Sequence, residues 1–145
     1  MSAPVYIPAP ELREIARELQ AAPTTGWRLW HIDLDRIEFV REVTCRPTRD
    51  AGQCIVVQPP VRAVLQARGA DCSHVIVVYG YHAEGKSRNW LKALVYHELR
   101  HIGYDGRLID HGVEDWPDVL AVCGVNWREA KDVPDVTGAG NARKP

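Results

Sequence analysis

An apolar run of strand length, followed after a polar loop by a longer amphipathic pattern, constrains the fold of this chain most. Val75 to Tyr79 is the most apolar segment of the sequence. Beyond the polar loop, apolar residues recur at helical spacing from about Arg88 to Ile102, and Ser87 is a suitable N-cap for that helix. The pattern therefore predicts a buried strand followed by a helix that Gly103 ends.

Shorter patterns predict the remaining elements. Leu12, Ile15 and Leu19 recur on one face of an N-terminal helix. Two further strands are predicted at residues 37–43 and 54–57. A short helix is predicted at residues 61–65 and a C-terminal helix at residues 115–123. We therefore expect an α+β fold, in which a small mixed sheet of about three strands packs against the N-terminal helix and helix 88–102, with a further C-terminal helix.

The length of the chain favours one domain. A chain of 145 residues can bury a single hydrophobic core, and we place the domain at residues 1–130. Residues 131–145 are rich in Pro, Gly, Asp and Lys and have almost no apolar side chain, which predicts a disordered tail.

Charge and apolar content argue against several classes of partner. The net charge is −1, which makes nucleic acid or an anionic membrane an unfavourable partner. No apolar run approaches the roughly 20 residues that span a bilayer. Residues 1–5 lack the basic start and apolar stretch of a secretory signal, so we expect a cytoplasmic protein. The four cysteines show no Cys-x-x-Cys spacing and are expected to be thiols.

Two histidines and a glutamate on the predicted helix form the strongest chemical signal. His97 and His101 are four residues apart, so on an α-helix both imidazoles lie on one face and converge on a single ion. Glu98 points to the edge of that site, where it can take a proton from a metal-activated water. This H-E-x-x-H arrangement is typical of zinc peptidases. The sequence therefore predicts Zn²⁺ held by His97 and His101, with Glu98 as the general base.

A catalytic zinc site normally has a third protein ligand. We prefer His111, because it is the only histidine after the motif. Gly103 and Gly106 give the intervening chain the freedom to turn back toward the metal.

Carboxylates after the motif supply the alternatives. Glu114 and Asp115 are candidates because zinc hydrolases also take a carboxylate as the third ligand. Asp115 could instead cap a helix, or accept a hydrogen bond from the free ring N–H of a ligand and fix its tautomer. Asp110 could accept such a hydrogen bond too, and Asp105 is a further candidate ligand.

Other polar side chains have weaker signals. Tyr81, His82 and Tyr104 are candidate donors to the oxyanion of an attacked carbonyl. We also expect an exposed edge of the strand Val75–Tyr79 to pair with an extended substrate backbone, which favours a peptide substrate. Structural or solvated roles are expected for the remaining histidines, namely His31, His74 and His82.

The H-E-L-R-H-I run that begins at His97 and the H-G-V-E-D-W run that begins at His111 resemble the putative phage metallopeptidase family. That family joins an H-E-L-x-H-I helix to a downstream H-D-V-x-D-F segment. Residues 34–40 also look like its first strand, so the likeness extends over about residues 10–125. The resemblance implies a minimal zincin fold and a zinc-dependent peptidase activity, with His111 as the third ligand and Asp115 as an important neighbour. Gly112 and Trp116 depart from the family pattern, which has Asp and Phe there.

Three other functions share parts of this pattern. A zinc-dependent endoribonuclease resembling the rRNA-maturation hydrolases has H-x-x-x-H before G-Y-D-H, and residues 103–105 match the G-Y-D. Gly106 and Arg107, however, stand where that family needs a third histidine, and Glu98 stands where it commonly has glycine. A non-catalytic zinc-containing module that binds a phage or host partner has no use for Glu98. A regulatory protease that cleaves repressors would share the chemistry and differ in its target.

Overall fold

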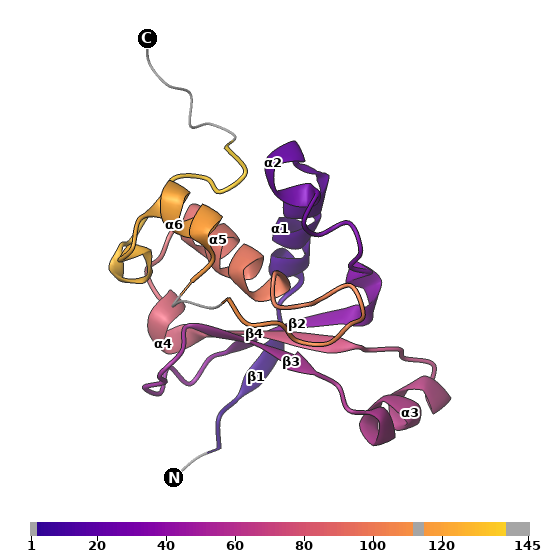
Figure 1. Cartoon of the computed structure of the whole chain (residues 1–145). Helices are drawn as coiled ribbons and strands as arrows, with labels where there is room; N and C mark the ends of the chain where they lie inside the picture. Colours follow the sequence, from indigo (N-terminus) through magenta and orange to yellow (C-terminus); the bar gives the residue numbers. More distant parts are fainter. Residues whose placement is uncertain (1–2, 112–114, 139–145) are drawn as a thin grey trace.

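The computed structural model describes residues 3–111 and 115–138, which form a mixed four-stranded sheet with several helices (Figure 1). The strand order is β1-β2-β4-β3, with β2 and β4 parallel and both outer pairs antiparallel. This arrangement confirms the predicted α+β class and mixed sheet. The elements along the chain are β1 (Tyr6–Pro8), α1 (Pro10–Ala21), α2 (Pro23–Gly26), η1 (Leu34–Arg36), β2 (Ile37–Glu42), β3 (Gly52–Val56), α3 (Pro59–Ala67), β4 (His74–Tyr79), α4 (Gly80–Ala83), α5 (Arg88–Leu99), α6 (Pro117–Cys123) and η2 (Trp127–Glu129).

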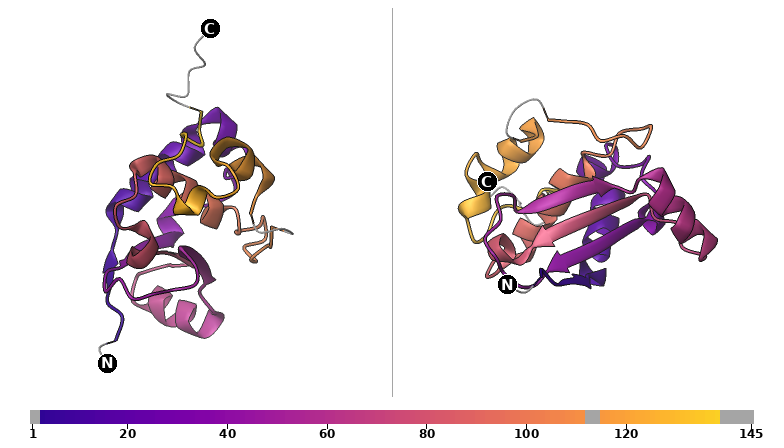
Figure 2. Two further views of the ribbon diagram at one scale, coloured as in Figure 1. Left: turned by 90° about the vertical axis from the view of Figure 1, so that its left-hand side faces the viewer. Right: turned by 90° about the horizontal axis from the view of Figure 1, so that it is seen from below.

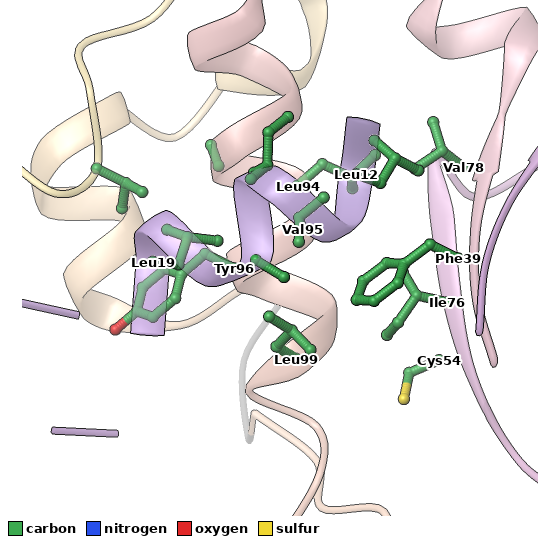
Figure 3. Close-up of a cluster of buried hydrophobic side chains, with 14 of the residues drawn as sticks. Leu12, Leu19, Phe39, Cys54, Ile76, Val78, Leu94, Val95, Tyr96 and Leu99 are labelled. Carbon is green, nitrogen blue, oxygen red and sulfur yellow. The ribbon is translucent and has the colours of Figure 1, made fainter. Parts of the chain in front are cut away.

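Helices α1 and α5 lie against the same face of the sheet, and the right-hand view of Figure 2 looks onto the opposite face. The hydrophobic core fills the space between these two helices and the strands (Figure 3). This core includes Leu12 and Leu19 of α1 and Leu94 and Leu99 of α5, all of which are at most 1% exposed. Burial of both helices on one sheet fixes the position of α5, which carries the H-E-x-x-H motif.

Strand β4 lies inside the sheet. Its register pairs Ile76 with Phe39 of β2 on one side and with Cys54 of β3 on the other. The prediction that the strand Val75–Tyr79 has an exposed edge is therefore wrong. A strand that is apolar on both faces is typical of the middle of a sheet, where neighbours cover it on all sides. Strand β3, at the end of the strand order, is the edge strand beside the motif helix.

Two elements differ from the sequence patterns in an instructive way. Strand β1 has no counterpart among the predicted elements, and its three residues are all exposed and pair with β2. Helix α3 forms where a short helix was predicted, but none of its residues is buried. Helical spacing of Val61 and Val64 therefore predicted the backbone conformation correctly without predicting burial.

The packed part of the chain continues past residue 130, the predicted end of the domain. Val133 and Val136 are each 5% exposed and belong to the core. Asp135 accepts a hydrogen bond from the buried Lys92 of α5 at 2.9 Å. Isolated apolar residues in a polar segment form no periodic pattern, so the sequence did not show this packing. Residues 139–145 lie outside the described residues.

No helix within residues 3–111 and 115–138 combines the length and the apolar character needed to cross a membrane.

Candidate metal centre

The end of helix α5 places His97 and His101 one turn apart. Ser87 caps the start of the helix, because its Oγ accepts a hydrogen bond from the Trp90 amide at 3.1 Å. The helix ends at Leu99, before the predicted Ile102, and a tighter turn follows in which the His101 amide donates to the Glu98 carbonyl at 3.1 Å. The tighter turn keeps the two rings together, with their Nε2 atoms 3.4 Å apart.

A loop after the helix returns the chain to the same place. Gly106 has φ of +82°, the left-handed conformation that glycine adopts without strain. Two histidines from distant segments hold the loop by donating to its carbonyls: His31 Nε2 to Ile102 O at 2.7 Å, and His74 Nε2 to Gly106 O at 2.8 Å. The Ile109 amide then donates to the His101 carbonyl at 2.7 Å, so the loop closes just before His111.

The three histidines of the predicted ligand set meet in space. One ligand nitrogen from each of His97, His101 and His111 lies within 4.8 Å of the other two. The ring centroids are 5.0 to 5.1 Å apart. Trp116 packs against this triad, with its ring centre 5.2 Å from those of His101 and His111. This is the one group of three or more potential ligand residues found among the described residues.

Hydrogen bonds on the far sides of two rings fix which nitrogens carry protons. His97 Nδ1 lies 2.6 Å from Asp115 Oδ1, and His101 Nδ1 lies 2.6 Å from the Ile109 carbonyl. The carbonyl is only an acceptor and the carboxylate acts as one, so each Nδ1 carries the hydrogen and each Nε2 carries a lone pair. Burial also lowers the pKa of His97 and of His101, which favours the neutral rings that bind metals.

The residues present fit a tetrahedral ion. Two Nε2 lone pairs that face each other repel unless a cation lies between them. Ligands bound at about 2.0–2.1 Å in a tetrahedron are about 3.4 Å apart, which matches the observed Nε2 separation. The donor set of three imidazoles suits Zn²⁺. The structure thus brings together a His triad able to hold a metal ion.

Glu98 lies beside the triad in a buried position. Its Oε1 is 3.9 Å from His97 Nε2, and the residue is 5% exposed. Burial raises the pKa of Glu98 to about 8, although the charge of Arg128 acts in the opposite direction. The backbone of β3 approaches closely, because a Cβ at Gly52 would lie 3.3 Å from Glu98 Oε1. Burial therefore gives the Glu98 carboxyl group a proton affinity suited to transfer near neutral pH.

Asp115 is fully buried behind His97. Its Oδ1 accepts from His97 Nδ1 at 2.6 Å and from the Trp116 amide at 2.7 Å, and its Oδ2 accepts from Trp127 Nε1 at 2.7 Å. Burial alone would raise the pKa of Asp115, but these hydrogen bonds lower it to about 2. Asp115 contacts the Nδ1 side of the ring, opposite the triad, and it does not cap α6, whose N-cap is Trp116. This hydrogen bond is the one that Asp115 would need in order to fix the tautomer of His97, a role that stays a prediction.

The other predicted carboxylates are placed as follows. The Asp105 carboxylate accepts from the Arg107 amide at 3.0 Å, so it shapes the tip of the loop. Asp110 lies in the wall of the cleft that contains the triad. Glu114, the other alternative ligand, and Gly112 lie outside the described residues.

The triad and Glu98 open into a cleft of about 1010 Å³. Tyr81 and His82, two of the candidate oxyanion donors, contribute to it. Tyr104 instead borders a second cleft, where its ring packs 4.4 Å from that of His31. The other walls of the first cleft include residues of β3, of the α4–α5 turn and of η2, among them Gly52, Gln53, Cys54, Lys86, Arg128 and Glu129.

Sequence reasoning missed Arg128. Its Nη1 lies 3.1 Å from Asp115 Oδ2, and its side chain lines the cleft. No motif marks this position, since Arg128 is 27 residues after His101 and follows no ligand spacing. A Trp-Arg pair shortly after the last predicted helix is the only local signal, and such pairs also occur on ordinary surfaces.

Comparison with known proteins gives one match. The family model described as "Putative phage metallopeptidase" matches residues 5–136, which is nearly all of the chain. No curated protein and no solved structure matches the chain.

Proposed function

The chain belongs to the putative phage metallopeptidase family, and from this premise we propose that it is a zinc-dependent peptidase with a minimal zincin-like fold. His97, His101 and His111 would hold the zinc ion. The observation that carries this proposal is the pair of Nε2 atoms 3.4 Å apart, on rings whose Nδ1 atoms face acceptors, with a nitrogen of His111 within 4.8 Å. Three imidazole ligands would leave one coordination position free for water or substrate, as in catalytic zinc sites.

The proposed mechanism assigns the proton transfers to Glu98. When bound, zinc polarises the scissile carbonyl and lowers the pKa of water toward about 7. Glu98 accepts a proton from the attacking water and delivers it to the nitrogen of the leaving amine. Its buried carboxyl, with a pKa raised to about 8 by burial, can both take up and release a proton near neutral pH. Asp115 keeps His97 in the tautomer and orientation that ligation needs.

The cleft beside the triad supports an extended peptide as the substrate. Strand β3 is an edge strand, so its outer N–H and C=O groups are available for pairing with another chain. Its residues Gly52, Gln53 and Cys54 lie in the wall of the same cleft as the triad. A peptide that adds as a strand at this edge would bring its backbone carbonyls past the metal. In this proposal the substrate pairs with the edge of β3 and not with the strand Val75–Tyr79.

The test compares the protein with its Glu98→Gln variant. Both are loaded with zinc, the bound zinc is measured, and each is offered fluorescein-labelled denatured casein and a structured RNA. We expect the unchanged protein to cut casein, and the variant to bind one zinc ion while losing cleavage by about 100-fold or more. RNA cleavage with the same dependence on Glu98 would favour the endoribonuclease instead. Bound zinc with neither substrate cut would favour a non-catalytic binding module.

A further inference from the structure

We propose that Arg128 is a substrate-binding residue, whose guanidinium donates hydrogen bonds to a backbone carbonyl of the peptide next to the scissile bond. This inference rests on the proposed peptidase function and adds a residue that the H-E-x-x-H motif does not contain.

The backbone of Arg128 is fixed from several directions. Its carbonyl accepts hydrogen bonds from Lys86 Nζ at 2.8 Å and from Trp90 Nε1 at 3.2 Å. Lys86 also donates to the Ala130 carbonyl at 2.9 Å, and the neighbouring Trp127 is buried. The short η2 helix is thereby attached to the start of α5, the helix that carries the motif. Arg128 is therefore held at a defined distance from the triad.

The guanidinium lies beside the ligands at the wall of the cleft. Nη1 is 3.1 Å from Asp115 Oδ2, Nη2 is 3.5 Å from His97 Nδ1, and the carbon between them lies 4.7 Å from the centre of the Trp127 ring. About a third of the side chain, 32%, remains exposed. A guanidinium has five N–H donors in a rigid fork, and Asp115 engages one side of it. Within residues 3–111 and 115–138, no carbonyl or carboxylate other than that of Asp115 pairs with the guanidinium, so its remaining donors can bind a ligand in the cleft.

A role confined to neutralising Asp115 does not account for this placement. Both Asp115 oxygens already accept hydrogen bonds from His97, the Trp116 amide and Trp127. A structural counter-ion would be most effective in the same buried region, whereas Arg128 reaches into the open cleft. A substrate carbonyl beside the metal is an acceptor without a partner, and a hydrogen bond from a positively charged donor would hold it strongly. The acceptor that fits this position is thus a peptide carbonyl.

The experiment compares two hydroxamates on the zinc-loaded protein by isothermal titration calorimetry. Acetohydroxamate binds the metal and has no peptide carbonyl, whereas acetyl-triglycine hydroxamate adds backbone carbonyls on one side. The variants are Arg128→Gln, Arg128→Lys and, as a matched control for loss of positive charge, Arg107→Gln, whose side chain is 88% exposed outside this cleft. Zinc content and thermal unfolding are measured for each protein.

We expect Arg128→Gln to bind the peptidyl hydroxamate about 10- to 100-fold more weakly, because a hydrogen bond from a charged donor is lost. The affinity of every variant for acetohydroxamate should lie within about threefold of that of the unchanged protein. Arg107→Gln should bind both hydroxamates with the affinity of the unchanged protein. Arg128→Lys keeps the charge but loses the fork, so it should show an intermediate loss, and it serves as the test if the glutamine variant does not fold.

Three results would overturn the proposal, and they can be distinguished from one another. Equal affinity of Arg128→Gln and the unchanged protein for the peptidyl hydroxamate, with acetohydroxamate binding intact, would remove Arg128 from the substrate site and leave the peptidase function standing. A failure of acetohydroxamate to bind the unchanged protein would refute the metal site, and with it both proposals. A parallel loss of both hydroxamates and of zinc in Arg128→Gln would assign Arg128 a structural role only.

Discussion

Replacement of Asp115 by asparagine tests the outer part of the proposed metal site without removing any of the three proposed ligands. Oδ1 of the carboxylate accepts hydrogen bonds from His97 Nδ1 and the Trp116 amide. Oδ2 accepts one from Trp127 Nε1 and forms an ion pair with Arg128 Nη1, a further donor group, at 3.1 Å. Asparagine offers one carbonyl oxygen and one NH₂ group, so in either orientation its NH₂ faces two of these donors. If it faces His97, the ring must move its proton from Nδ1 to Nε2, the nitrogen that would bind zinc.

The magnitude follows from that conflict. Loss of an outer hydrogen bond to a metal-binding histidine weakens metal affinity by about 10- to 100-fold, or about 1.4 to 2.7 kcal/mol. We expect Asp115→Asn to fall in this range. Competition with a chromophoric zinc chelator at fixed pH measures it directly, at a temperature where circular dichroism shows the variant to be folded.

Asp118→Asn is the matched control. Asp118 lies three residues further along and accepts hydrogen bonds from Tyr96 and Arg100, but not from the triad. The Asp118→Asn substitution removes the same charge and should leave the zinc affinity unchanged. If Asp115→Asn binds zinc within threefold of the unchanged protein, the hydrogen bond to His97 does not control ligation and the reasoning from tautomers is wrong.

Four further predictions follow from the same structure. His111→Ala should lose zinc more readily than Asp115→Asn in the chelator assay, and the reverse order would exchange their roles. His74 does not touch the triad, but His74→Leu should weaken zinc binding because the Gly106 carbonyl loses its hydrogen-bond donor. A change in unfolding free energy of about 1 to 3 kcal/mol without any change in zinc affinity would contradict this prediction. A chain ending at Ala130 should be less stable than one ending at Gly138 by at least about 3 kcal/mol in urea unfolding, since Val133 and Val136 leave the core, and equal stability would show that this segment is dispensable. The hydrogen bond from Arg88, with the help of Lys92, lowers the pKa of Glu18 from 4.5 to about 2. The contribution of ionised Glu18 to stability is therefore complete above pH 4.5 and is lost as the pH falls toward 2. Glu18→Gln should therefore reduce the stability difference between pH 6 and pH 3 by at most about 1 kcal/mol, because the side chain is 46% exposed, and an unchanged difference would refute the assignment.

The parts of the site that sequence could predict are those that depend on local periodicity. His97, Glu98 and His101 lie within five residues, so helical geometry alone fixes their relation once the helix is recognised. The helix itself was recognisable from its cap at Ser87 and its apolar spacing. His111 followed from counting histidines and from the two glycines, of which Gly106 has the positive φ that the turn requires.

The parts that sequence could not predict depend on contacts between distant segments. Arg128 reaches the cleft only because Lys86 and Trp90 hold its backbone, and these partners are 42 and 38 residues away. The same limit applies to the sheet. The apolar run Val75–Tyr79 correctly predicted a buried strand, but its place between β2 and β3 depends on a parallel pairing that no local pattern encodes. An uninterrupted apolar run was in fact evidence for a central strand.

The position of the third histidine connects the metal site to the rest of the fold. The loop that carries His111 is held by His31, from the segment after α2, and by His74, at the start of β4. His97 is held by Asp115, which in turn is held by Trp127 of η2. The three histidines therefore converge only when the segments that carry His31, His74 and Trp127 are packed together with α5. An ion that binds only this folded arrangement must stabilise the whole domain by mass action, so zinc should raise the unfolding midpoint of the entire chain and not merely order one loop.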